Sequence, residues 1–158
     1  MKIFQKGFNY SQDGPGNRLV YHLQGCNFSC KWCSNADSIP FENPKAKSLS
    51  VESIYDEIIR SRMMFFDGGG VTFTGGEPTM REDLPELIAH AKWFVSRLNT
   101  NGVKLTKEYC QALKDAELDS LQITFYDVQE EVHNKLVGAA NYDKPVDGIR
   151  NALAVGLN

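Results

Sequence analysis

The sequence predicts an α/β fold, a partial TIM-type barrel in which about four parallel strand–helix (βα) units are present. Four short β-forming segments alternate with four helical segments, and this alternation is typical of a parallel sheet covered by helices. Each strand segment is followed by an unusual polar or glycine-rich segment, and chemistry in such folds gathers at the carboxyl ends of strands. Since no repeat or low-complexity tract divides residues 1–158, we expect one domain.

The predicted strands are short runs rich in β-forming residues that end at turn signals. They are residues 18–24, 70–74, 94–98 and 120–125. Four parallel strands form an open sheet but do not close a barrel. Residues 155–158 resemble the turn into a fifth strand. We therefore expect a fragment or an unusually short protein.

The predicted helices carry apolar stripes and start at capping side chains. In residues 50–66, Ser50 is a good N-cap, and Ile54, Ile58 and Ile59 form the apolar stripe. The other helices are predicted at residues 82–91, 106–116 and 145–155, the last with Gly156 as its C-terminal cap. We expect all four to cover the outside of the sheet.

Composition narrows the class of protein. The net charge is −3, and no stripe of Lys and Arg suggests a nucleic-acid surface. No apolar run approaches the roughly 20 residues of a membrane helix. The first residues, MKIFQKGFNYSQDG, lack the apolar core of a secretion signal. We therefore expect a cytoplasmic protein with neither nucleic acid nor membrane as a partner.

Three of the four cysteines, Cys26, Cys30 and Cys33, form a C-x3-C-x2-C pattern directly after the first predicted strand. Clustered thiols in a reducing compartment are more often metal ligands or redox groups than disulfides. Three thiolates on one loop can each bind one iron of a 4Fe–4S cluster. The fourth iron would then have no protein ligand and could bind a substrate.

Other uses of these cysteines fit the sequence less well. A structural zinc requires four ligands, yet the remaining cysteine, Cys110, lies far along the chain and no histidine is near the loop. A redox pair of Cys30 and Cys33 would leave Cys26 unexplained. Cys110 is interpreted as a small core residue of a helix.

The cysteine pattern, with the aromatic Trp32 before the last cysteine, resembles that of the radical S-adenosylmethionine enzymes. Within that superfamily the chain looks most like activating enzymes of glycyl-radical enzymes, of the pyruvate formate-lyase activase kind. Residues 13–18 (DGPGNR), 68–77 (GGGVTFTGGE) and 131–138 (EVHNKLVG) resemble segments of those enzymes. The similarity runs from about Phe8 to the end of the chain, where those enzymes would continue with further βα units.

The resemblance implies two cofactors, a 4Fe–4S cluster on the three cysteines and S-adenosylmethionine. It implies that Gly75, Gly76 and Glu77 receive the methionyl ammonium of the second cofactor. A glycine turn lets backbone carbonyls approach a ligand closely, and a carboxylate offsets the ammonium charge. The alternative is a tight strand-to-helix turn with a solvated Glu77.

Further cofactor-binding residues are implied by position. Trp32 would lie beside the adenine, Asn35 matches an asparagine of the activases, and the cofactor's ribose and carboxylate are expected at Asn99 and Thr100. The structural alternatives are a core tryptophan for Trp32, a loop turn for Asn35, and a polar turn after a strand for Asn99 and Thr100. Thr124, with Tyr126 and Asp127, is a possible polar group at the end of the fourth strand.

Two departures from the activase pattern affect the expected substrate. Residues 99–102 read NTNG where activases usually have DTNG, and residues 124–126 read TFY where they have DLK. Carboxylate and ammonium groups are thus missing from the expected site. The three histidines, His22, His90 and His133, are placed on a strand, a helix and a loop and interpreted as structural or surface residues.

The resemblance implies an oxidoreductase that works under anaerobic conditions. A one-electron donor such as flavodoxin or ferredoxin reduces the cluster, S-adenosylmethionine is cleaved to a 5′-deoxyadenosyl radical, and the radical takes hydrogen from a glycine of a partner glycyl-radical enzyme. No catalytic residue beyond the cluster ligands is required. The alternatives are an anaerobic ribonucleotide reductase activase, another radical enzyme acting on a peptide or small molecule, an iron–sulfur electron carrier and a zinc-binding module.

Overall fold

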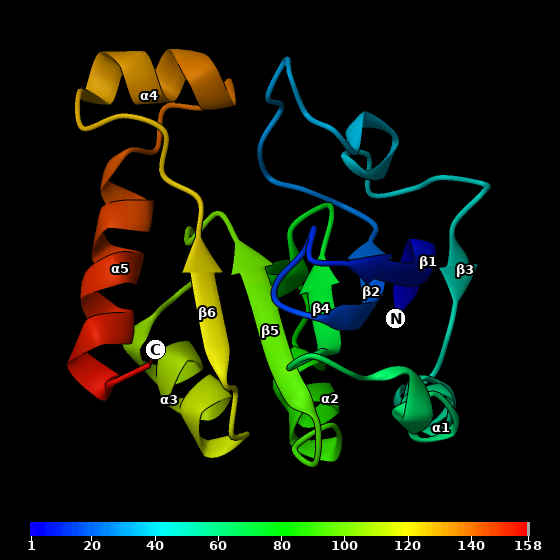
Figure 1. Cartoon of the computed structure of the whole chain (residues 1–158). Helices are drawn as coiled ribbons and strands as arrows, with labels where there is room; N and C mark the ends of the chain where they lie inside the picture. Colours follow the sequence, from blue (N-terminus) through cyan, green and yellow to red (C-terminus); the bar gives the residue numbers. More distant parts are fainter. Residues whose placement is uncertain (158) are drawn as a thin grey trace.

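The centre of the fold is a six-stranded mixed sheet with strand order β3-β1-β2-β4-β5-β6 (Figure 1). The computed structural model describes residues 1–157. Four neighbouring strands run parallel: β2 (Asn17–Leu23), β4 (Gly70–Thr74), β5 (Val95–Thr100) and β6 (Ser120–Ile123). They match the four predicted strands to within two residues at each end, which confirms the predicted α/β sheet of a partial barrel.

Helices α1 (Val51–Arg60), α2 (Leu84–His90), α3 (Lys107–Asp115) and α5 (Asp143–Val155) correspond to the four predicted helices. Ser50 caps α1 by accepting a hydrogen bond from Ser53 N at 3.1 Å. The predicted continuation of α1 to Phe66 is wrong. A short 3-10 turn, η2 (Arg62–Met64), follows α1, and Phe65 packs its ring against Phe94 at 5.2 Å between centroids. Tertiary packing of the aromatic ring thus overrides local helix propensity here.

Three elements were not expected from the sequence. β1 (Lys2–Tyr10) pairs antiparallel with β2, and the two-residue strand β3 (Lys47–Ser48) pairs with β1. The helix α4 (Glu130–Val137) contains His133, so the expectation that His133 lies on a loop is wrong. Figure 1 shows α4 above the carboxyl ends of the parallel strands. Besides η2, the 3-10 turns of the described residues are η1 (Ala36–Ser38) and η3 (Pro78–Met80).

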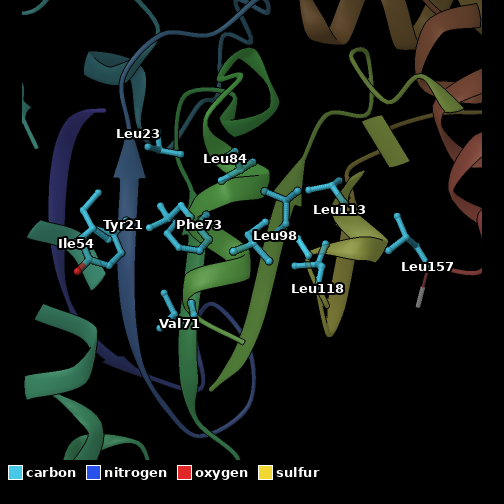
Figure 2. Close-up of a cluster of buried hydrophobic side chains, with 14 of the residues drawn as sticks. Tyr21, Leu23, Ile54, Val71, Phe73, Leu84, Leu98, Leu113, Leu118 and Leu157 are labelled. Atoms are coloured by element: carbon cyan, nitrogen blue, oxygen red, sulfur yellow. The ribbon is translucent and has the colours of Figure 1, made fainter. Parts of the chain in front are cut away.

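The hydrophobic core lies between one face of the sheet and the helices (Figure 2). Tyr21, Phe73 and Leu98 come from neighbouring strands, and Ile54 and Leu113 come from α1 and α3. Cys110 is fully buried in this core, which confirms its interpretation as a core residue. Because side chains alternate along a strand, the residues between these strand positions face the opposite side of the sheet.

That opposite side is polar along β5 and β6. Arg97 and Asn99 alternate with the buried Ser96, Leu98 and Thr100. Arg97 pairs laterally with Thr72 on one side and Ser120 on the other, and Asn99 pairs with Gln122. No helix within residues 1–157 combines the length and apolar character needed to cross a bilayer.

His133 is a buried polar residue without a hydrogen-bond partner. Its side chain is fully buried, and neither ring nitrogen has a partner among the described residues. Its ring packs against Phe125 at 4.7 Å and Tyr142 at 5.7 Å between centroids. Desolvation lowers the pKa of His133, and the charge of Asp127 opposes this only in part. The folded state therefore holds a neutral imidazole.

We expect His133→Phe to reduce the loss of stability on acidification. The unfolded chain takes up a proton at His133 near pH 6.5 and the folded chain resists it, so the free energy of unfolding falls as pH drops below that value. At pH 5.5 this linkage costs at most about 1.4 kcal/mol. Urea unfolding at pH 7.5 and pH 5.5 measures the difference between the two proteins.

The variant His90→Gln is the control, because it removes an exposed imidazole elsewhere on the protein. If the unfolding free energies of wild type and His133→Phe change equally between the two pH values, the buried, neutral imidazole is not the cause.

Candidate cofactor site

A cavity opens at the carboxyl ends of the parallel strands. Its volume is about 230 Å³, several times the share of one water molecule, roughly 30 Å³. Four segments far apart in the sequence form its wall: the cysteine loop, the turn after β4, and the segments at the ends of β5 and β6. The residues that line it are Cys26, Phe28, Cys30, Trp32, Cys33, Ser34, Asn35, Thr74, Gly75, Gly76, Asn99, Thr100, Asn101, Thr124 and Tyr126. The polar and glycine-rich segments thus converge as the sequence predicts.

Backbone hydrogen bonds hold the first half of the cysteine loop, residues 26–33. Cys26 N donates to Ile39 O at 2.9 Å, and Ser29 N donates to Val137 O at 3.1 Å, at the end of α4. Gly138 caps α4 in the left-handed conformation, and a Cβ there would lie 2.7 Å from Ser29 Oγ. A glycine at this position therefore allows α4 to lie directly against the cysteine loop.

All three cysteines of the loop are free thiols, partly exposed, and line the cavity. No group of three His, Cys, Asp or Glu side chains in residues 1–157 converges as a site for a single metal ion. Three thiols without a fourth partner do not fit the closed, four-ligand coordination of structural zinc. They fit a 4Fe–4S cluster, because each thiolate then binds a different iron.

The environment keeps the thiols of Cys26 and Cys30 neutral when no metal is bound. Burial raises the pKa of Cys26 to about 11. Burial also raises the pKa of Cys30, and the neighbouring Cys33 adds to the rise. Bound iron supplies the positive charge that turns such thiols into thiolates. A metal centre in the loop would therefore displace the thiol protons of Cys26 and Cys30.

The turn after β4 packs directly against the start of the cysteine loop. Gly75 and Gly76 have φ angles of 66° and 53°, in the left-handed region. A Cβ on Gly76 would lie 2.5 Å from Gly25 O, and Glu77 N donates to that same oxygen at 2.7 Å. Both glycines line the cavity. The protein backbone itself requires the Gly-Gly pair, independently of any ligand.

Glu77 is placed behind the cavity wall and is not one of its lining residues. Its side chain is 2% exposed. Its Oε1 accepts hydrogen bonds from Thr79 Oγ1 and Thr100 Oγ1, each at 2.6 Å, and its Oε2 accepts one from Asn101 N at 2.7 Å. Burial raises the pKa of Glu77, and these hydrogen bonds oppose the rise. The alternative of a solvated Glu77 is therefore wrong. The carboxylate links the turn after β4 to the end of β5.

The remaining predicted residues, Trp32, Asn35, Asn99, Thr100 and Thr124, all line the cavity. Trp32 is 45% exposed, so the alternative of a core tryptophan is wrong. Its ring packs edge-on against Tyr126 at 5.5 Å between centroids. These positions place the residues at one site, and what they bind there stays a prediction.

Sequence reasoning did not assign Phe28, Ser34, Thr74 and Asn101 to the cavity. Asn101 joins the end of β5 to the cysteine loop, because its Nδ2 donates to Asn27 Oδ1 at 2.7 Å. Its place in a polar turn after a strand is a signal that could have identified it. Thr74, the last residue of β4, is recognisable in the same way.

Comparisons with known proteins agree with the fold and the motifs. The family model of the Radical SAM superfamily matches residues 20–158. A probable GTP 3′,8-cyclase of Sulfolobus acidocaldarius is 36% identical over 135 residues, which are 84% of this chain and 41% of that protein. A pyruvate formate-lyase-activating enzyme of Streptococcus mutans is 34% identical over 100 residues, 63% of this chain and 36% of that enzyme. The chain thus spans less than half the length of these relatives.

Solved structures share the fold at lower identity. SuiB of Streptococcus suis bound to the precursor peptide SuiA superimposes with a TM-score of 0.70 at 17% identity, over 88% of this chain and 30% of SuiB. The enzyme anSMEcpe with bound AdoMet gives 0.63 at 20% identity, over 86% of this chain and 40% of that one. Members of the superfamily use a 4Fe–4S cluster and S-adenosylmethionine. By its match over residues 20–158, the chain belongs to the radical SAM superfamily.

Proposed function

We propose that the chain holds a 4Fe–4S cluster on Cys26, Cys30 and Cys33 and binds S-adenosylmethionine in the adjoining cavity. The observation that carries the proposal is that the three thiols line the same cavity as the Gly75–Gly76 turn and the ends of β5 and β6. When bound and reduced by a donor such as flavodoxin or ferredoxin, the cluster supplies the electron that cleaves S-adenosylmethionine to methionine and a 5′-deoxyadenosyl radical, which then abstracts hydrogen.

The chain's own residues bind and orient the cofactor. The backbone of Gly75 and Gly76 offers carbonyl oxygens at the cavity wall, and Asn99 and Thr124 offer neutral polar side chains there. The packed rings of Trp32 and Tyr126 form part of the cavity wall. No acid or base from the protein is needed, because the chemistry is that of the cofactors.

For the hydrogen donor we favour a glycine of a partner glycyl-radical enzyme. The segments 13–18, 68–77 and 131–138 support this, as does the similarity to the activating enzyme of Streptococcus mutans. The anaerobic ribonucleotide reductase activase remains the alternative within the same class of reaction.

A second candidate is a small molecule related to a nucleotide. The similarity to a GTP 3′,8-cyclase extends over 84% of this chain, against 63% for the activating enzyme. Asn99 and Thr124 stand where activases usually have aspartates, and Tyr126 stands where they have a lysine. These three substitutions remove charges expected for the activase reaction and so favour a different substrate.

The three loop cysteines should each be essential for the cluster, whereas Cys110 should not. After anaerobic reconstitution with iron and sulfide, we expect wild type to absorb broadly near ~400 nm, as iron–sulfur proteins do. Cys26→Ala, Cys30→Ala and Cys33→Ala should lose this absorption and all cleavage of S-adenosylmethionine. Iron and sulfide content per chain, together with the yield of 5′-deoxyadenosine under dithionite, are the measurements.

Cys110→Ala is the matched control, since it removes a thiol from the core at a distance from the cavity. It should lower the melting temperature but keep the iron content. Loss of the cluster in this variant, or one tightly bound zinc in wild type, would contradict the three-ligand assignment.

The variant Glu77→Gln tests whether the carboxylate only links two segments of the chain or also contacts the cofactor. The amide cannot accept all the hydrogen bonds that Glu77 accepts, and one buried donor left unpaired costs about 1–3 kcal/mol. We therefore expect the cofactor-free protein to lose about that much unfolding free energy. Urea unfolding without cofactor is the measurement, and binding of S-adenosylmethionine to the reconstituted protein is measured alongside.

Glu86→Gln, on the exposed side of α2, is the control. If Glu77→Gln is as stable as this control but binds S-adenosylmethionine more weakly, the carboxylate contacts the cofactor directly, as the resemblance implies.

A further inference from the structure

Arg97 is an ordered arginine whose hydrogen-bond acceptors are all neutral. Its Nε donates to Asn99 Oδ1 at 3.3 Å, one terminal nitrogen donates to Ser120 Oγ at 3.5 Å, and the other donates to Gln122 Oε1. None of the ion pairs within residues 1–157 includes it. A guanidinium has five N–H donors, so two donors remain for a ligand.

A second guanidinium lies beside it. Arg18 is fully buried and donates to Thr72 Oγ1 at 2.7 Å and to the backbone oxygens of Pro15, Gly68, Val71 and Val95. Both arginine side chains pack on Gly14, where a Cβ would lie 2.9 Å from Arg97 Cδ and 3.1 Å from Arg18 Cδ. Burial lowers the pKa of Arg18, and the like charge of Arg97 lowers it further.

The nearby carboxylates are bound to other groups. Asp13 accepts a hydrogen bond from Asn9 Nδ2 at 2.5 Å, and Asp119 accepts one from Ser96 N at 2.8 Å, on the helix side of the sheet. Both acids oppose the fall in the pKa of Arg18, but neither pairs with an arginine. The polar face therefore carries two adjacent guanidinium groups that no carboxylate contacts, which favours an anionic ligand.

The two guanidinium groups lie next to the cofactor cavity. Asn99 lines the cavity and also accepts the hydrogen bond of Arg97. Gln122 lies two positions before the cavity-lining Thr124. Two residues along a strand span about 6.6 Å, so a ligand of modest size can reach both Arg97 and the cavity.

We propose that Arg97 is a specificity-determining residue that binds an oxyanion, a phosphate or carboxylate group, of the substrate on the polar face of the sheet. The inference rests on the proposed function, in which the substrate is held beside the radical formed in the cavity. The planar fork of Arg97 suits either group, because both present paired oxygens. Asn99, Ser120 and Gln122 hold the fork in place while leaving its charge uncompensated.

The test measures binding of three anionic probes to the full chain, anaerobically reconstituted with iron and sulfide. Inorganic phosphate and GTP represent the phosphate source, succinate represents the carboxylate source, and guanosine is the uncharged partner of GTP. We expect at least one anionic probe to bind wild type, more weakly at high salt. Arg97→Gln should bind that probe at least 10-fold more weakly, and guanosine should not distinguish the two proteins.

Two further variants keep the result interpretable. Arg150→Gln removes an exposed arginine of α5, which pairs with Asp147, and should bind the probe as wild type does. Arg97→Lys keeps the charge but loses the fork, so it should bind with intermediate affinity, and it also serves if Arg97→Gln does not fold. If no anionic probe binds wild type, or if the Arg97 and Arg150 variants bind equally, the proposal is wrong.

Binding of the probes is read separately from cluster content and cleavage of S-adenosylmethionine. Failure of cleavage with anion binding intact would contradict the proposed function and leave the anion site standing. Binding of phosphate and GTP would identify a phosphorylated substrate, whereas binding of succinate alone would identify a carboxylate.

Discussion

The site depends on one buried carboxylate. Glu77 accepts hydrogen bonds from Thr79, Thr100 and Asn101, and its own backbone N–H donates to Gly25 O. Three strand ends, those of β2, β4 and β5, are thereby held together. A buried carboxyl group is tolerated only when it is hydrogen-bonded, so the three segments must adopt this arrangement together. Asn101 extends the same network to Asn27 in the cysteine loop.

This constraint explains how a short loop can present three thiols to one cavity. The first part of the loop is fixed by backbone bonds to Ile39 and Val137, while the Gly75–Gly76 turn supports its start from the other side. Cys30 and Cys33 then face the cavity together with Trp32. In the proposed function, this arrangement positions the cofactors, which supply the chemistry.

The sequence predicts the parallel strands well because each is a compact β-forming run followed by glycine or polar residues. It does not predict β1, whose residues are mostly exposed and include Gly7, so no clear alternation marks it. The helix α4 is also missed, although Glu130 and Glu131 in its first turn are a signal for a helix start. A motif places Glu77 at the site but does not tell which way its carboxylate points. Arg97, a charged residue in the middle of a strand, is a signal that could have been noticed.

The central claim is that one iron of the bound cluster has no protein ligand and is open to S-adenosylmethionine. The most direct measurement is the electron paramagnetic resonance spectrum of the reconstituted, dithionite-reduced protein, with and without S-adenosylmethionine bearing ¹⁷O in its carboxylate. We expect a shifted signal on addition of the compound and line broadening from the ¹⁷O label. A spectrum unchanged by the compound would show that no iron is available to it and would contradict the open-iron assignment.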